Sequence, residues 1–137
     1  MRAIALASLV AGCGTQFVPE VPPTFTDVYA ELFPRQTISQ CVFCHANPPN
    51  EISNGMFSVG DDQTTAYPAL MDISHSAKCG DTYTLIVPGD PDASLVYQKL
   101  ALDPPPCGDR MPLGNDAISK TKLKLVRDWI LAGAKDD

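Results

Sequence analysis

The sequence predicts an all-α domain of three to four short helices joined by long loops. Two stretches, 25–33 and 119–132, space their apolar residues at the three- and four-residue intervals of an amphipathic helix. The apolar run Leu85-Ile86-Val87 is too short to build a sheet. With 13 prolines and 9 glycines among 137 residues, loops must occupy much of the chain.

The length, charge and hydropathy of the chain argue against several classes of protein. A length of 137 residues supports one domain. The formal net charge of −6 argues against binding to nucleic acid or to an anionic lipid surface. No apolar run reaches the roughly 18 residues that a transmembrane helix needs, so none is predicted.

The first predicted helix covers 25–33. Thr24 or Thr26 can serve as its N-cap, and Pro34 ends it because proline cannot continue a helix. Its apolar face consists of Phe25, Val28, Tyr29, Leu32 and Phe33.

Two further helices are expected in the middle of the chain. One lies around 62–71 and contains Pro68. The other begins at Asp90-Pro91-Asp92, which offers an aspartate cap, a proline at the first position and a carboxylate in the first turn. It extends to about Leu100, and the Pro- and Gly-rich stretch 103–115 cannot be regular structure.

The last predicted helix covers 119–132. Ser119 is its expected N-cap and Gly133 the residue just beyond its end. Trp129 is expected to pack against the first helix. Helices this short leave a thin apolar core, so such a domain needs something else inside it.

Residues 1–12 are predicted to be a signal peptide, because Arg2 precedes a short apolar run. The run ends in Val10-Ala11-Gly12-Cys13, which resembles a bacterial lipobox, so Cys13 is the predicted lipidation site. The alternatives are an ordinary secretory peptide in which the cysteine is coincidental, or a buried first strand.

Residues 13–23 are then the lipidated N-terminus and a proline-rich tether that holds the domain off a membrane surface. Gly14 follows the lipid site where lipoproteins retained in the inner membrane carry an aspartate, which favours the outer membrane. The expected location is the periplasmic side of a bacterial membrane, where disulfides persist.

The most informative motif is Cys41-Val42-Phe43-Cys44-His45, the attachment signature of c-type haem. Two thiols three residues apart on a helical turn can form thioethers with the two vinyl groups of one porphyrin. The imidazole that follows can then bind the iron from one face. We therefore expect one covalent haem c on Cys41 and Cys44, with His45 as an axial ligand.

Three other interpretations of this motif are open. A thioredoxin-like dithiol would need a βαβ surrounding, which the flanking sequence does not offer. A zinc site would need Cys41, Cys44, Cys79 and Cys107 as its four ligands, and it would give His45 no role. A structure without any cofactor is the third.

The motif and the order of elements around it resemble a class I monohaem cytochrome c, of the kind attached to exported bacterial lipoproteins. The resemblance covers about Phe25 to Ala134 and implies that 24–137 is a cytochrome c-like domain wrapped around its haem. Besides the attachment motif it rests on Val87-Pro88-Gly89, Ser94-Leu95, Met111-Pro112, Trp129-Ile130 and Gly133-Ala134.

The resemblance implies a methionine as the sixth ligand, carried on a loop well after the attachment motif. Met111 lies in such a loop, shortly before the last helix, and is the predicted ligand. Met56 and Met71 are interpreted as core residues. The alternatives are His75, which would give bis-histidine ligation, and an open site.

Cys79 and Cys107 remain once one cysteine is assigned to lipid and two to haem. In an oxidising compartment we expect them to form a disulfide worth roughly 3–4 kcal/mol that anchors the Met111 loop. Two reactive thiols are the alternative. Candidate partners for the haem propionates are Tyr67, Tyr83, Tyr97, Arg110 and Trp129, although packing or a solvated position would explain each of them.

The expected function is electron transfer through one haem c with His/Met ligation, and not an enzyme activity. Six-coordinate iron leaves no position for a reactant. The expected partners are other redox proteins, with the membrane reached only through the lipid anchor. One alternative is a haem with an exchangeable sixth site and peroxidase-like or gas-binding activity. Another is a module in a surface complex in which haem is a structural plug.

Overall fold

The computed structural model describes residues 20–34, 41–45, 58–60, 62–74, 76 and 78–137. Its helices are α1 (Phe25–Leu32), α2 (Cys41–Cys44), α3 (Gln63–Leu70), the 3-10 helix η1 (Gly80–Thr82), α4 (Leu95–Ala101) and α5 (Lys120–Leu131). Within these ranges, extended backbone pairs only at an isolated antiparallel bridge between Ile73 and Thr84. The predicted all-α class is therefore confirmed for the part of the chain that the structure describes.

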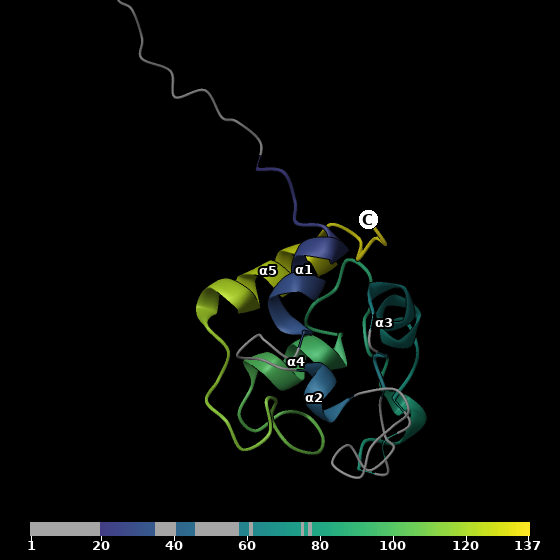
Figure 1. Cartoon of the computed structure of the whole chain (residues 1–137). Coiled ribbons are helices and arrows are strands. Elements are labelled where there is room, and N and C mark those ends of the chain that lie inside the picture. Colours follow the sequence, from purple (N-terminus) through teal and green to yellow (C-terminus); the bar gives the residue numbers. More distant parts are fainter. Residues whose placement is uncertain (1–19, 35–40, 46–57, 61, 75, 77) are drawn as a thin grey trace, which may run out of the picture.

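The core lies where α1 crosses α5. α1 packs against both α5 and α3, and α5 packs against α4 (Figure 1). The rings of Phe25 and Trp129 are buried at this crossing, with centroids 5.3 Å apart. The predicted packing of Trp129 against the first helix is confirmed.

The first turn of α1 is capped by Thr24, which precedes it, and by Asp137, which follows α5. Thr24 is the N-cap: its hydroxyl accepts a hydrogen bond from the Asp27 amide (3.1 Å), and the Asp27 carboxylate accepts one from the Thr24 amide (2.9 Å). The hydrogen bonds that the Thr24 amide and hydroxyl donate to the Asp27 carboxylate lower the pKa of Asp27. Asp137 accepts from the amides of Phe25 (2.9 Å) and Thr26 (3.0 Å). The exposed donors of the first turn are thus satisfied.

α5 begins after its predicted cap, Ser119, and α3 begins after Asp62, the first residue of the range predicted for that helix. The Asp62 carboxylate accepts from the Thr65 amide at 2.9 Å, and the Ser119 hydroxyl accepts from the Lys122 amide at 3.3 Å. Gly133 follows the end of α5 with φ +102°, a left-handed conformation that favours glycine.

The segment after α5 folds back onto the core. The Trp129 indole donates to the Lys135 carbonyl (2.9 Å), and the Tyr67 hydroxyl donates to the Ala134 carbonyl (2.9 Å). Through these bonds, and through Asp137, the last residues join α5 to α3 and to the start of α1.

The predicted start of α4 is wrong. Asp90 was expected to cap it, but the helix begins at Leu95, and 91–93 form a turn. The Asp90 carboxylate does accept a backbone hydrogen bond, from the Ala93 amide at 3.0 Å, but it closes this turn instead of a helix.

Tertiary contacts explain the later start. The buried Ser94 hydroxyl donates to the Asp90 carbonyl (2.7 Å) and accepts from the Val87 amide (2.9 Å), which fixes the turn. The Leu95 amide donates to the Thr84 carbonyl at 3.1 Å and not to a carbonyl one helical turn earlier. The chain before Leu95 is therefore held out of the helix.

The capping of α1 by Asp137 yields a stability prediction. Asp137→Ala should lower the free energy of unfolding by about 1 kcal/mol, because the Phe25 amide loses its acceptor. Urea unfolding followed by circular dichroism measures the change. Asp136→Ala is the matched control and should stay within about 0.5 kcal/mol. Equal effects of the two substitutions would contradict the capping role.

Candidate functional site

The three residues of the attachment motif share one face of α2. At about 100° per residue, Cys41, Cys44 and His45 fall within roughly 100° of arc around the helix axis. Val42 points into the core and is 4% exposed, whereas Phe43 is 48% exposed. The cysteines and the histidine are all partly accessible. This short turn therefore presents two thiols and one imidazole to the same side.

Backbone hydrogen bonds fix this turn to the rest of the fold. The Val42 amide donates to the Phe33 carbonyl at the end of α1 (3.1 Å). The His45 amide donates to the Cys41 carbonyl (2.8 Å), which carries the helical pattern through the histidine. The His45 carbonyl accepts from the amide of Val59 (2.9 Å), a fully buried residue. The motif is thus anchored on both sides.

The environment of Cys41 suits a neutral thiol. Burial raises the pKa of Cys41 to about 12, and the neighbouring Cys44 thiol acts in the same direction. A redox-active dithiol needs a thiolate that forms readily near neutral pH. The raised pKa of Cys41 therefore disfavours that interpretation.

Cys79 and Cys107 are placed at disulfide distance, with sulfurs 2.10 Å apart. They belong to a second buried cluster with Leu85 and Leu95, at the start of α4. Because these two sulfurs are engaged with each other, the four-cysteine zinc site is not assembled. Within the described ranges, no three His, Cys, Asp or Glu side chains gather as metal ligands would.

Met111 lies in the irregular segment that follows α4, as the sequence predicted. Its amide donates to the Lys99 carbonyl at 2.9 Å. Its side chain is partly buried against the main core cluster, which also contains Val42 of the attachment turn. The loop methionine and the attachment motif therefore contact one common core.

The other candidates of the sequence analysis have different positions. Met71 is at the end of α3 and packs against the main core cluster, in keeping with a core residue. Met56, His75 and the predicted lipidation site Cys13 lie outside the described residues.

Two buried polar side-chain atoms have no hydrogen-bond partner in the described part of the chain. They are Nη1 of Arg110 and Oε1 of Gln98. Unsatisfied buried groups are costly, so the Nη1 donor of Arg110, the residue before Met111, fits a site completed by an acceptor such as a haem propionate. Oε1 of Gln98 is itself an acceptor, so it cannot pair with an ionised propionate, and the amide nitrogen of Gln98 donates to the Asp92 carbonyl.

The aromatic candidates for propionate binding are less suitable than predicted. The polar hydrogens of Tyr67 and Trp129 already donate to backbone carbonyls after α5. These positions fit packing, the alternative given for each of the two residues. Tyr83 and Tyr97 are partly buried against the two clusters.

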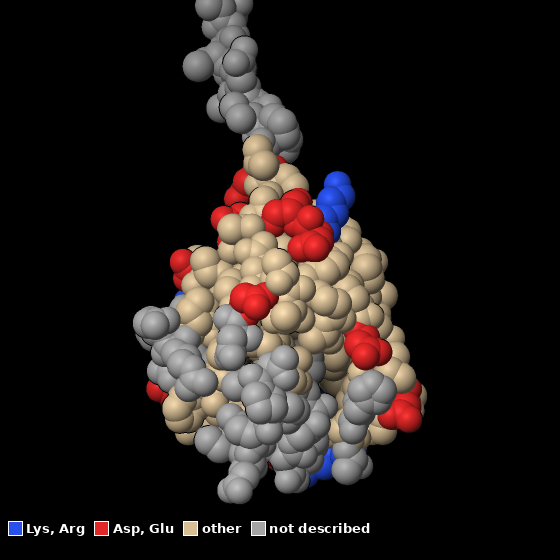
Figure 2. Space-filling model, turned by 45° about the vertical axis from the view of Figure 1, so that its right-hand side comes forward, with Lys and Arg blue, Asp and Glu red and all other residues tan. Residues whose placement is uncertain are grey.

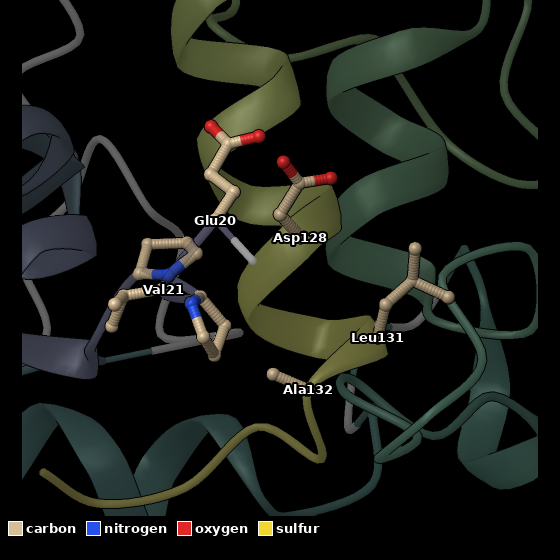
Figure 3. Close-up of a pocket in the computed structure, with 7 residues that line it drawn as sticks. Glu20, Val21, Asp128, Leu131 and Ala132 are labelled. Carbon is tan, nitrogen blue, oxygen red and sulfur yellow. The ribbon is translucent and has the colours of Figure 1, made fainter. Parts of the chain in front are cut away.

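A shallow groove lies where the tether meets the domain (Figure 3). Two of its lining residues contact Lys124, which forms an ion pair with Asp128 and lies 3.9 Å from the Glu20 carboxylate. None of the predicted site residues lines this groove, and Figure 1 shows the tether leaving at the opposite end of the domain from α2. The lining residues are Glu20, Val21, Pro22, Pro23, Asp128, Leu131 and Ala132.

Comparison with known proteins gives no family for this chain. No protein-family model matches it, and no curated protein and no solved structure matches it either. In the described ranges, no helix has both the length and the apolar character needed to cross a membrane.

The disulfide yields a second stability prediction. Replacing both Cys79 and Cys107 by serine should lower the free energy of unfolding by roughly 3–4 kcal/mol, because the bridge closes a loop across a sequence separation of 28. Urea unfolding measures the loss, and reductant added to the unmodified protein should reproduce it. An unchanged free energy of unfolding would contradict a stabilising bridge.

Proposed function

We propose that this chain is an electron-transfer protein that carries single electrons through one covalently bound haem c. The observation that supports this most is the arrangement of Cys41, Cys44 and His45 on one face of a turn that is anchored at both ends. This is the arrangement that two thioethers and an axial imidazole on one porphyrin require. The sequence resemblance to class I cytochromes c supports the same function and a cytochrome c-like fold.

In this proposal each site residue has one role. Cys41 and Cys44 hold the porphyrin through thioethers, and His45 and Met111 are the axial ligands of the iron. Arg110 provides a buried donor, Nη1, for a propionate. The haem supplies reversible one-electron oxidation and reduction, and no residue is assigned a catalytic role.

The proposed ligand pair favours electron transfer over substrate chemistry. A thioether in the sixth position favours reduced iron and raises its potential, and it leaves no position open for a reactant. The anchoring of the turn and the loop to one core limits rearrangement of the ligands, which keeps the cost of changing the oxidation state low.

The tether and the surface charge suggest where the protein works. A lipid on Cys13 would hold the domain at the periplasmic side of a bacterial membrane, and the tether leaves the domain away from α2 (Figure 1). The described surface in Figure 2 carries scattered acidic side chains with a broad uncharged area between them. With a net charge of −6, a basic docking surface on the redox partner is favoured.

Covalent attachment is tested by removing the thiols. The full chain, expressed with a haem c maturation system, should give a pyridine haemochrome spectrum of c-type haem and keep its colour in acidic acetone. The variant with Cys41→Ala and Cys44→Ala should lose covalent haem completely. The matched control, with Cys79→Ser and Cys107→Ser, also removes two cysteines but should keep it. A colourless unmodified protein would overturn the proposal.

The sixth ligand is tested by truncating the two core-packed methionines separately. Met111→Ala should abolish the far-red absorption band of Met-ligated ferric haem and allow the ferrous protein to bind carbon monoxide. Met71→Ala, which removes a thioether of similar burial, should leave both properties unchanged. If His75→Ala changes the spectrum and Met111→Ala does not, the ligation is bis-histidine. Carbon monoxide binding by the unmodified protein would support an open site instead.

A further inference from the structure

Lys99 of α4 is the main link between that helix and the loop that carries Met111. Its ammonium donates to the carbonyls of Cys107 (2.9 Å) and Asp109 (3.1 Å). Its own carbonyl accepts from the Met111 amide (2.9 Å). Lys99 therefore contacts the loop at every second residue, at Cys107, Asp109 and Met111.

The loop is shaped to close over this ammonium. Gly108 has φ +58°, and a Cβ atom there would lie 3.0 Å from Nζ of Lys99, so glycine permits the close approach. The Asp109 carboxylate pairs instead with Lys78, at 2.6 Å, on the exposed side of the loop. The Lys99 ammonium thus donates to two backbone carbonyls of the loop, which fixes the path of its backbone.

We propose that Lys99 is a positioning residue that holds the Met111 sulfur in place as the sixth ligand. This inference rests on the proposed function. The disulfide fixes the loop at Cys107, and the Lys78–Asp109 ion pair contacts it from the exposed side. The two ammonium hydrogen bonds and the backbone bond to Met111 restrain its backbone between Cys107 and Met111, and hydrogen bonds from a charged donor are stronger than those between neutral groups.

The test compares three variants of the haem-loaded full chain. Lys99→Leu removes the ammonium and keeps an apolar stem, and Lys99→Arg restores a cationic donor. Lys78→Leu is the matched control, because it removes the same charge from the exposed side of the same loop. The measurements are the far-red band of the ferric protein and the rate at which imidazole displaces the sixth ligand. That rate reports how often the iron–sulfur bond opens.

We expect Lys99→Leu to raise the rate of imidazole binding by about tenfold or more, the scale expected for losing charge-assisted hydrogen bonds. Lys99→Arg should recover most of the difference, and Lys78→Leu should stay within about twofold of the unmodified protein, as expected for an exposed ion pair. If the role of Lys99 is purely structural, Lys99→Leu should lower the free energy of unfolding of the protein without changing this rate.

The outcomes separate the two proposals. If the unmodified protein shows the far-red band and the Lys99→Leu and Lys78→Leu variants bind imidazole at equal rates, the role of Lys99 is overturned and the proposed ligands stand. If the unmodified haem protein lacks the band, Met111 is not the ligand, and the proposed ligand set and the role of Lys99 fail together.

Discussion

The contact between Phe25 of α1 and Trp129 of α5 is the interaction on which the rest of the structure depends. Both rings are buried where α1 crosses α5, the first and the last helix of the described chain. The attachment turn is joined to α1, because the Val42 amide donates a hydrogen bond to the carbonyl of Phe33 just after that helix. α4 packs against α5, and the residues after α5 return through Asp137 to cap α1. A change at the crossing would therefore move both parts of the proposed site.

The two parts of the proposed site are held by different means. The His45 side is fixed by backbone hydrogen bonds to α1 and to buried Val59, so its position follows directly from the core. The Met111 side has no regular structure of its own, and a disulfide together with Lys99 ties it to α4. Under the proposed function this difference has a physical reason. A thioether is a weaker iron ligand than an imidazole, so the Met111 side needs the additional restraint.

The sequence was sufficient where local chemistry decides the structure. The caps Thr24 and Ser119 satisfy amides in their own first turn, so a short pattern predicts them. The same pattern misled at Asp90, because the Ser94 hydroxyl bonds back to the Asp90 carbonyl and the Leu95 amide bonds to the Thr84 carbonyl, which delays the helix. Lys99 could not have been recognised from sequence, since a lysine in an amphipathic helix is ordinarily solvated. Its role depends on a loop that returns to α4 after eight residues or more.

The position of the core changes what a haem would contribute to this domain. From sequence, the helices looked too short to enclose a core without a cofactor. In the structure, the crossing of α1, α3 and α5 is closed by its own side chains, with Phe25, Leu70 and Ile130 almost fully buried. The incompletely packed features lie at α2 and the Met111 loop, where the cysteines are partly accessible and buried Nη1 of Arg110 lacks a partner. The proposed haem would therefore complete the part of the domain around α2 and the Met111 loop, while the crossing of α1, α3 and α5 is closed by its own side chains.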